Sequence, residues 1–202
     1  MASLSIRCIV FDFGRTLSSG PYFGPLGREG IARVSTLVFG DNSPRWADPW
    51  MRGELSSRDV ARYLAEHTPY AVEELLDALR RGCSDMAFNP AVWDLAVEQR
   101  GLVRKLALVT ANMDVFSEVV VPAHRLDETF HAIVNSADYG TLDKANLWQH
   151  AFDLIGEGCS YAQSLLVEDS LRNVELFRAL GGQAYLYTDD ASLRAWLATA
   201  DL

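Results

Sequence analysis

Polar and acidic residues follow four short apolar runs in this 202-residue chain. Asp12 follows the first run, Thr110 the second and Asn135 the third, while Glu168 and Asp169 follow the fourth. Runs this short, rich in Val, Ile and Leu without alternating polar residues, are typical of strands covered on both faces. Functional groups gather where the carboxyl ends of parallel strands meet. We therefore expect these five side chains to lie at one edge of a sheet.

The residue types at these positions suit covalent catalysis. Asp12 can act as a nucleophile and form an aspartyl intermediate, which divides one difficult step into two easier ones. Thr110 offers a hydroxyl and Asn112 an amide, and Lys144 is a compact cation that can neutralise a nucleophile and an incoming anion. Alternatively, Asp12 forms a turn, Thr110 caps a helix and Lys144 pairs with Asp143 at the surface.

Glu168 and Asp169 are adjacent acids at a strand end. Two carboxylates so close are costly unless a cation lies between them and Asp12. Mg²⁺ is the natural choice, because it takes oxygen ligands and usually keeps several waters. Together with Lys144, these groups suit phosphoryl transfer, in which positioning and charge neutralisation supply most of the catalysis.

Strands alternating with helices would position these residues in an α/β fold with a doubly wound parallel sheet. We expect helices over Asn89–Lys105, Leu147–Ile155 and Leu171–Leu180, of which the first begins with an Asn-Pro cap and the last ends at a glycine. The expected strands are Ile6–Phe11, Leu106–Val109, Ala132–Val134, Ser164–Val167 and Gln183–Tyr187.

Residues 18–88 interrupt this alternation. A Gly/Pro-rich loop is followed by three helical patterns, at Arg28–Val38, Ser57–His67 and Val72–Arg81. A helical insert after the first strand would lie over the carboxyl edge of the sheet. We therefore predict an α/β core at 1–17 and 89–202 and a small helical cap at 18–88.

Composition excludes several classes of protein. The net charge of −9 makes nucleic acid an improbable partner. Three widely spaced cysteines form neither a disulfide framework nor a zinc pattern. The chain contains no 18-residue apolar stretch and its first residues do not form a signal peptide, so we expect a cytoplasmic protein with no membrane partner. Nothing in the sequence indicates the oligomeric state.

Four motifs in this order resemble those of the haloacid dehalogenase-like (HAD) hydrolase superfamily, and the likeness covers nearly the whole chain. They are FDFGRTL with Asp12, LALVTAN with Thr110, SADYGTLDKANLW with Lys144, and LLVEDSLRNVELFRALGG with Asp169. The helical insert is similar to the cap of the dehalogenase-like and small-phosphatase branch. The resemblance implies a Rossmann-like core.

The resemblance also implies a role for each matching residue. Asp12 would be the nucleophile, with Thr110 and Lys144 holding phosphoryl oxygens. Magnesium would be held by Asp12, the Gly14 carbonyl, Glu168 and Asp169, with Asn173 in support. Arg15, Ala111 and Asn112 would bind substrate. The implied activity is a Mg²⁺-dependent phosphatase that acts on a small phosphorylated metabolite through an aspartyl phosphate.

The sequence departs from the family pattern at two places. Gly14 stands where most family phosphatases carry a second Asp as general acid and base, and Arg15 replaces the usual Gly. One extra residue separates Gly140 from Lys144, and Ala145 stands where Pro is common. Two alternatives therefore stay open, namely a metal-independent 2-haloacid dehalogenase-type hydrolase and a catalytically weak binding or regulatory protein. Arg15 either reaches a substrate anion or points to solvent.

Overall fold

The computed structural model describes residues 6–41, 44–102, 104–156 and 159–200. Its centre is a parallel sheet of five strands in the order β3-β2-β1-β4-β5. These strands are β1 (Cys8–Phe11), β2 (Lys105–Thr110), β3 (Ala132–Asn135), β4 (Ser164–Glu168) and β5 (Gln183–Leu186). The α/β fold and the parallel sheet predicted from the apolar runs are confirmed, and the five predicted strands match within two residues at each end.

The register brings the strand ends to one edge. Phe11 of β1 pairs with Leu108 of β2 and with Val167 of β4, so Asp12 emerges between its two neighbouring strands. The backbone N–H of Asp12 donates to Val167 O at 3.0 Å, which extends the pairing by one residue. The central position of β1 therefore places Asp12 in the middle of the carboxyl edge.

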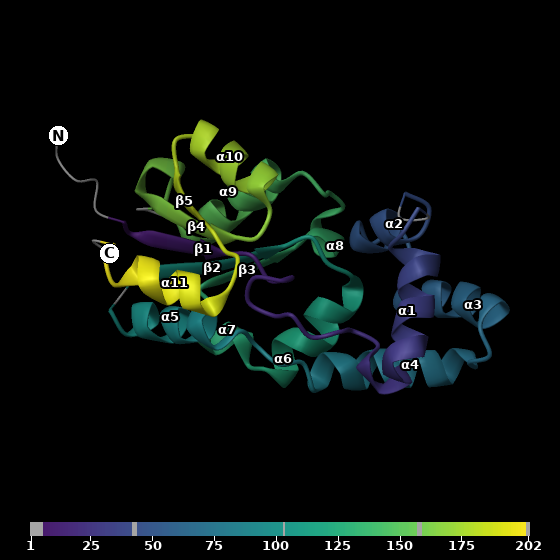
Figure 1. The fold of residues 1–202 in the computed structure, drawn as a ribbon. Helices are drawn as coiled ribbons and strands as arrows, with labels where there is room; N and C mark the ends of the chain where they lie inside the picture. The colour runs from purple at the N-terminus through teal and green to yellow at the C-terminus, as the bar shows by residue number, and fades with distance from the viewer. Residues whose placement is uncertain (1–5, 42–43, 103, 157–158, 201–202) are drawn as a thin grey trace.

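Helices cover both faces of the sheet (Figure 1). On one face α9 (Lys144–Ile155) packs on β2 and β3, and α10 (Leu171–Ala179) packs on β4 and β5. On the other face α5 (Pro90–Gly101) packs on β2 and is joined by α7 (Leu126–Thr129) and α11 (Asp190–Leu197). Because both faces are covered, the strands are apolar throughout rather than alternating.

Short helical turns complete the core between the strands. They are η2 (Phe116–Val120), α6 (Val121–Ala123), α8 (Ser136–Tyr139) and η3 (Tyr161–Gln163). None of the helices in the described residues is both long enough and apolar enough to cross a membrane.

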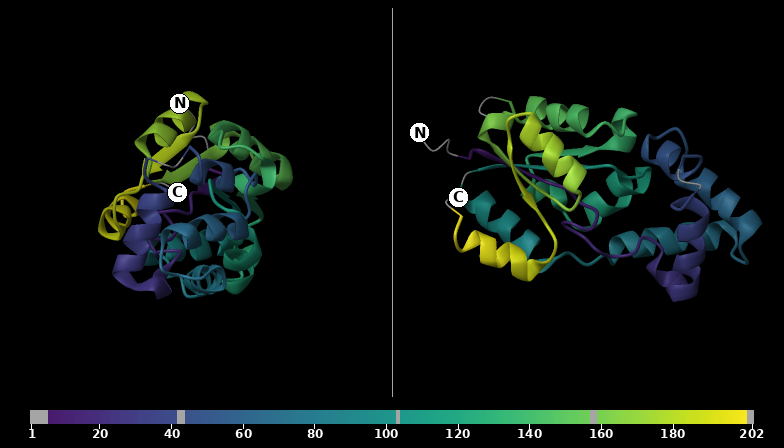
Figure 2. Two further views of the ribbon diagram at one scale, coloured as in Figure 1. Left: turned by 90° about the vertical axis from the view of Figure 1, so that its right-hand side faces the viewer. Right: turned by 45° about the horizontal axis from the view of Figure 1, so that its top comes forward.

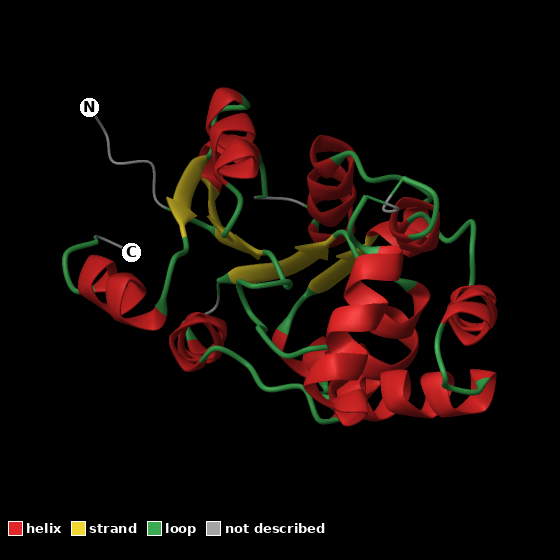
Figure 3. Ribbon diagram, turned by 45° about the vertical axis from the view of Figure 1, so that its right-hand side comes forward, coloured by secondary structure: helices red, strands yellow, loops and turns green. Residues whose placement is uncertain are grey.

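Residues after β1 form a helical insert that stands beyond the carboxyl ends of the strands (Figures 2 and 3). It contains η1 (Gly24–Leu26), α1 (Gly27–Val38), α2 (Ala47–Met51), α3 (Ser57–His67) and α4 (Val72–Ser84). We call these helices and their connecting loops the insert. The prediction that residues 18–88 form a separate cap domain stays a prediction.

The predicted helix over Asn89–Lys105 is wrong at its carboxyl end. The helix stops at Gly101, and Lys105 is the first residue of β2. Its backbone N–H donates to Arg7 O at 3.0 Å, so strand pairing wins over the helical pattern there. Asn89 occupies the N-cap position without a side-chain cap bond, because its amide donates instead to Thr16 O at 2.7 Å.

Candidate active site

A cavity of about 450 Å³ lies at the carboxyl edge of the sheet. We call it the site cavity. It is lined by Asn173, the expected support for the metal, and by all nine residues that the sequence analysis assigns directly to catalysis, substrate binding or metal binding. The nine are Asp12, Gly14, Arg15, Thr110, Ala111, Asn112, Lys144, Glu168 and Asp169.

Asn135 is the exception among the strand-end residues, because it does not line the site cavity. It is fully buried, and its amide nitrogen donates to Met113 O at 2.9 Å and to Ser117 Oγ at 3.1 Å. As the last residue of β3, Asn135 lies at the carboxyl edge of the sheet as predicted, but its side chain does not join the others in the site cavity. It braces the segment that follows β2 instead.

The Asp12 carboxylate and the Lys144 ammonium form a buried ion pair. Lys144 Nζ lies 2.6 Å from Asp12 Oδ1, and both side chains are about nine-tenths buried. Burial raises the pKa of Asp12 to about 6, against the opposing pull of Lys144. Burial disfavours the ammonium, but Asp12 and Glu168 outweigh it and raise the pKa of Lys144. Lys144 therefore offsets part of the cost of burying the Asp12 carboxylate.

Lys144 reaches this position as the first residue of α9. The Asp143 side chain caps that helix by accepting from Ala145 N at 2.9 Å and from Asn146 N at 3.4 Å. Lys144 Nζ also donates to Val109 O at 3.3 Å. The extra residue before Lys144 thus does not keep the lysine from Asp12, and Asp143 serves the helix rather than pairing with the lysine.

Asp12, Glu168 and Asp169 form an acidic cluster whose oxygens lie within 4.8 Å of one another. Glu168 Oε1 accepts from Ser170 N at 3.2 Å. Its Oε2 is buried, and its nearest cation is Lys144 Nζ at 3.5 Å, too long for a strong hydrogen bond. Burial raises the pKa of both Glu168 and Asp169. A buried carboxylate oxygen without a close hydrogen-bond donor is a suitable ligand for a cation such as Mg²⁺.

Arg15 lies on the turn that follows Asp12. Its φ of 61° is in the left-handed region, which is uncommon for a residue with a side chain. The backbone is held there because Arg15 N donates to Ser18 O at 2.6 Å and Ser18 N donates to Phe13 O at 2.8 Å. Arg15 Nε lies 3.0 Å from Asp169 Oδ2, while 82% of the side chain stays exposed. The guanidinium thus stands at the mouth of the site cavity.

The insert supplies an apolar wall that sequence reasoning missed. Tyr22, Phe39 and Met51 line the site cavity opposite the strand ends. Asn112 joins the two sides, because its amide nitrogen donates to Tyr22 Oη at 2.5 Å. The Gly/Pro-rich loop containing Tyr22 is visible in the sequence, but it does not reveal which aromatic residue turns inward.

Asp114 fastens the insert to the core. Its carboxylate accepts from Trp50 Nε1 at 2.8 Å and from the backbone N–H of Ser57 at 2.8 Å, and it also binds the Ser57 hydroxyl at 2.5 Å. Ser136 Oγ adds a bond to Met51 O at 2.5 Å. Polar contacts from the segments after β2 and β3 therefore hold the insert over the site cavity.

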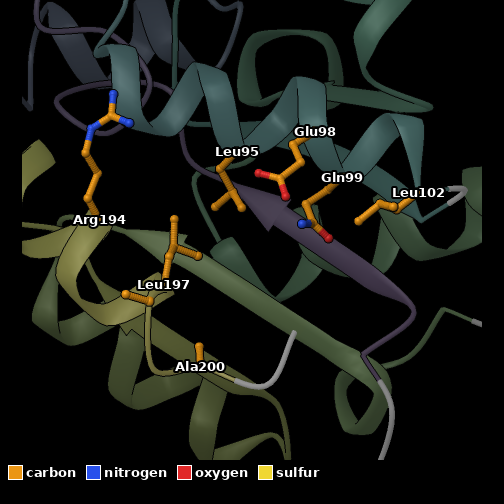
Figure 4. A pocket seen from close by; sticks show the side chains of 8 residues that line it. Leu95, Glu98, Gln99, Leu102, Arg194, Leu197 and Ala200 are labelled. Carbon is orange, nitrogen blue, oxygen red and sulfur yellow. The ribbon is translucent and has the colours of Figure 1, made fainter.

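Another cavity of about 490 Å³ lies between α5 and α11 (Figure 4). Its charged lining residues are Glu98 and Arg194, one acid and one base. Arg194 is paired with Asp94 at 2.9 Å. This surface lacks the buried charge cluster of the site cavity, so the site cavity is the candidate active site.

Comparisons with known proteins were made by sequence and by structure. Neither a scan against protein-family models nor a search of curated proteins finds a match. A predicted HAD-like family hydrolase from Porphyromonas gingivalis is similar in structure, with a TM-score of 0.67, 17% identity and coverage of 96% of this chain and 98% of that chain. The chain has a HAD-like fold.

Two other structures with the HAD-like fold bear on the site. A HAD family enzyme from Bacteroides thetaiotaomicron, in complex with magnesium and inorganic phosphate, has a TM-score of 0.65 and 13% identity over 91% of this chain and 95% of that chain. L-2-haloacid dehalogenase from Xanthobacter autotrophicus has a TM-score of 0.65 and 12% identity over 98% of this chain and 84% of that chain. Both kinds of HAD-like protein are thus similar to this chain in overall fold.

Proposed function

We propose that this protein is a hydrolase of phosphate monoesters that uses Asp12 as nucleophile and depends on Mg²⁺. The observation that carries the proposal is the acidic cluster of Asp12, Glu168 and Asp169 beside the buried ammonium of Lys144. A dianionic phosphoryl group needs such a balance of cations and positioned oxygens. The neighbour that binds magnesium and inorganic phosphate supports the proposal.

Asp12, Glu168 and Asp169 would hold the magnesium ion, with the Gly14 carbonyl as a further ligand. When bound, the ion neutralises charge on the phosphoryl oxygens. Lys144 neutralises the Asp12 carboxylate and orients it toward phosphorus, and Thr110 donates a hydrogen bond to a phosphoryl oxygen. Arg15, Ala111 and Asn112 would contact the substrate at the rim of the site cavity.

The reaction divides into two displacements at phosphorus. Asp12 Oδ attacks phosphorus, the bond to the ester oxygen breaks, and its electron pair leaves with that oxygen. Water then attacks phosphorus of the aspartyl phosphate, which releases inorganic phosphate and restores Asp12. Gly14 has no side chain, so position 14 does not supply a proton in the first step or remove one in the second.

Carbon–halogen hydrolysis is the second candidate, because the dehalogenase from Xanthobacter autotrophicus has a TM-score equal to that of the magnesium and phosphate complex. Without a bound metal ion, the buried Glu168 carboxylate beside Asp169 would have no clear role in the reaction. The acidic cluster therefore favours hydrolysis of phosphate monoesters over hydrolysis of carbon–halogen bonds. A binding protein without turnover is the third candidate, and Gly14 is the feature that motivates it.

The test is hydrolysis of 4-nitrophenyl phosphate with Mg²⁺ and with EDTA. We expect Mg²⁺-dependent turnover in the wild type and a loss of about 10³-fold or more in Asp12→Asn. Asp153→Asn is the matched control, since Asp153 is exposed on α9 and accepts from Gln149 Nε2 at 2.8 Å. Metal-independent release of halide from a 2-haloacid, or Mg²⁺ binding without any turnover, would contradict the proposal.

A further inference from the structure

A second cavity of about 540 Å³ adjoins the site cavity. We call it the insert cavity. Arg15, Tyr22 and Phe39 line both cavities, so the two meet at these three side chains. The remaining lining residues of the insert cavity come from the loop after β1 and from α1. They are Pro21, Phe23, Ile31, Val34 and Ser35.

The lining of the insert cavity is mostly apolar and aromatic, and Arg15 is its one charged residue. Phe39 is 38% exposed, and its ring centroid lies 6.2 Å from that of Trp50, so part of its surface remains available to a bound group. Two hydroxyls are present, on Tyr22 and Ser35. Burial raises the pKa of Tyr22 and outweighs the opposing effect of the hydrogen bond that Tyr22 Oη accepts from Asn112 Nδ2, so Tyr22 is a weak acid there.

Because the insert cavity adjoins the site cavity at the shared side chains, an organic group esterified to a phosphoryl group at Asp12 can extend into it. Among the described residues, its lining contains no carboxylic acid, and Gly14 beside it has no side chain. A positioned general acid is typically worth about 10²–10⁴ in rate. Without a general acid among these lining residues, the site suits a leaving group that departs as a stable anion. A phenol, whose pKa is about 10, meets this requirement far better than an aliphatic alcohol.

We infer that the insert cavity binds the leaving group and that the substrates are phosphate monoesters of phenols. This inference rests on the proposed function and adds the substrate class. As Asp12 Oδ bonds to phosphorus, the phosphorus–oxygen bond breaks and its electron pair departs with the phenolate, which takes a proton from solvent. Arg15, at the junction of the two cavities, balances the charge on that oxygen. Arg15 is the specificity-determining residue.

Turnover of a series of esters tests the leaving-group requirement. We expect kcat/KM to fall steeply from 4-nitrophenyl to phenyl to butyl phosphate, with butyl phosphate at least about 10²-fold below phenyl phosphate. Gly14→Asp is the informative variant, because a Cβ at Gly14 meets nothing within 4 Å. The added carboxyl should raise the butyl-to-phenyl ratio of kcat/KM by about tenfold or more. Equal turnover of butyl and phenyl phosphate by the wild type would overturn the inference.

Arg15→Gln tests the guanidinium separately. Because phenolate is a poorer leaving group than 4-nitrophenolate, it needs more charge balance at the oxygen. The variant should therefore lose kcat/KM toward phenyl phosphate several-fold more than toward 4-nitrophenyl phosphate, and Arg15→Lys should recover part of that difference. Equal losses toward the two esters would contradict the assigned role.

Binding gives a readout that needs no turnover. Calorimetry with Mg²⁺ present should find phenylphosphonate bound about tenfold or more tightly than methylphosphonate, because the ring is buried in the insert cavity. Ser35→Trp fills the cavity and should abolish that preference. Thr36→Trp is the matched control, since Thr36 is the next exposed residue on α1 and does not line the insert cavity.

The two proposals fail in different ways. Absence of all phosphate-ester hydrolysis would contradict the proposed function. Hydrolysis that depends on Asp12, combined with equal binding of the two phosphonates or with an unchanged preference in Ser35→Trp, would overturn the inference alone.

Discussion

The sheet and the insert form opposite walls of the site cavity and differ in the kind of side chain that they supply. The sheet side carries the buried charges of Asp12, Lys144 and Glu168, held by ion pairs of 2.6 and 3.5 Å. The insert side carries Tyr22 and Phe39, which are uncharged and aromatic. Under the proposed function, the sheet side would make the bond to phosphorus and the insert side would hold the organic part of the substrate.

The two walls also differ in how they are positioned. Asp12 and Glu168 are fixed by the register of adjacent strands, which the chain cannot change without breaking the sheet. The insert is held by side-chain hydrogen bonds to Asp114 and Ser136. Because the two walls are positioned separately, residues of the insert can be substituted without moving the charged residues at the strand ends.

The largest expected effect comes from removing the cation of the sheet wall. Lys144→Met leaves the Asp12 and Glu168 carboxylates buried without compensation, so the free energy of unfolding should fall by about 3–5 kcal/mol. Urea unfolding without Mg²⁺ measures this loss. Lys105→Met is the control, because Lys105 is exposed at the start of β2. An equal loss in the free energy of unfolding for the two variants would contradict the compensation of the buried carboxylates by Lys144.

A smaller effect is expected where the insert wall is fastened. Asp114→Ala leaves the buried Trp50 indole and the Ser57 N–H without their acceptor, which should cost about 1–3 kcal/mol. Hydrogen exchange should speed up in α2 and α3 and stay unchanged in β1 and β4. Asp138→Ala, which removes an exposed contact to Ser117, should stay within about 0.5 kcal/mol. Faster exchange throughout the sheet would contradict separate positioning of the walls.

Metal binding sharpens the comparison further. If the acidic cluster holds Mg²⁺ as proposed, the ion at ten times its dissociation constant should stabilise the protein by about 1.4 kcal/mol, because the cluster exists only in the folded state. Glu168→Gln should weaken that stabilisation, whereas Ser35→Trp on the insert side should keep it. Thermal unfolding with and without Mg²⁺ measures both variants. Stabilisation that survives Glu168→Gln unchanged would place the ion elsewhere.

The smallest effect concerns the opposite edge of the sheet. His131 Nδ1 accepts from Leu106 N at 3.0 Å, and burial with nearby Arg100 lowers the pKa of His131. A lowered folded-state pKa means that the stabilising contribution is present above the unfolded pKa of about 6.5 and is lost as the pH falls below it. His131→Asn should therefore lose less stability than the wild type between about pH 7.5 and about pH 5.5. A greater loss in the variant would contradict this sign.

The sequence predicted the sheet wall well because strand ends are local features. Short apolar runs fix where Asp12, Thr110 and Glu168 emerge, and parallel pairing brings them together. Asn135 follows the same pattern, yet it turns inward to bond the loop after β2. Whether a strand-end side chain faces the cavity or the interior depends on the packing around it, and the apolar run that predicts the strand carries no information about that packing.

The insert wall could not be predicted in the same way. Tyr22 meets Asn112 across 90 positions of sequence, and Asp114 meets Trp50 across 64. Such contacts depend on the path of a Gly/Pro-rich loop rather than on a periodic pattern. The pairing of Arg15 with Asp169 depends likewise on a left-handed turn.

The central claim is that phosphorus becomes bonded to Asp12. Rapid acid quenching of the wild type with Mg²⁺ and radiolabelled 4-nitrophenyl phosphate, followed by peptide mapping, tests it directly. The account predicts a transient phosphoryl group on the peptide that contains Asp12, and no label in Asp12→Asn. Label on a different residue, or hydrolysis by Asp12→Asn at the wild-type rate, would contradict it.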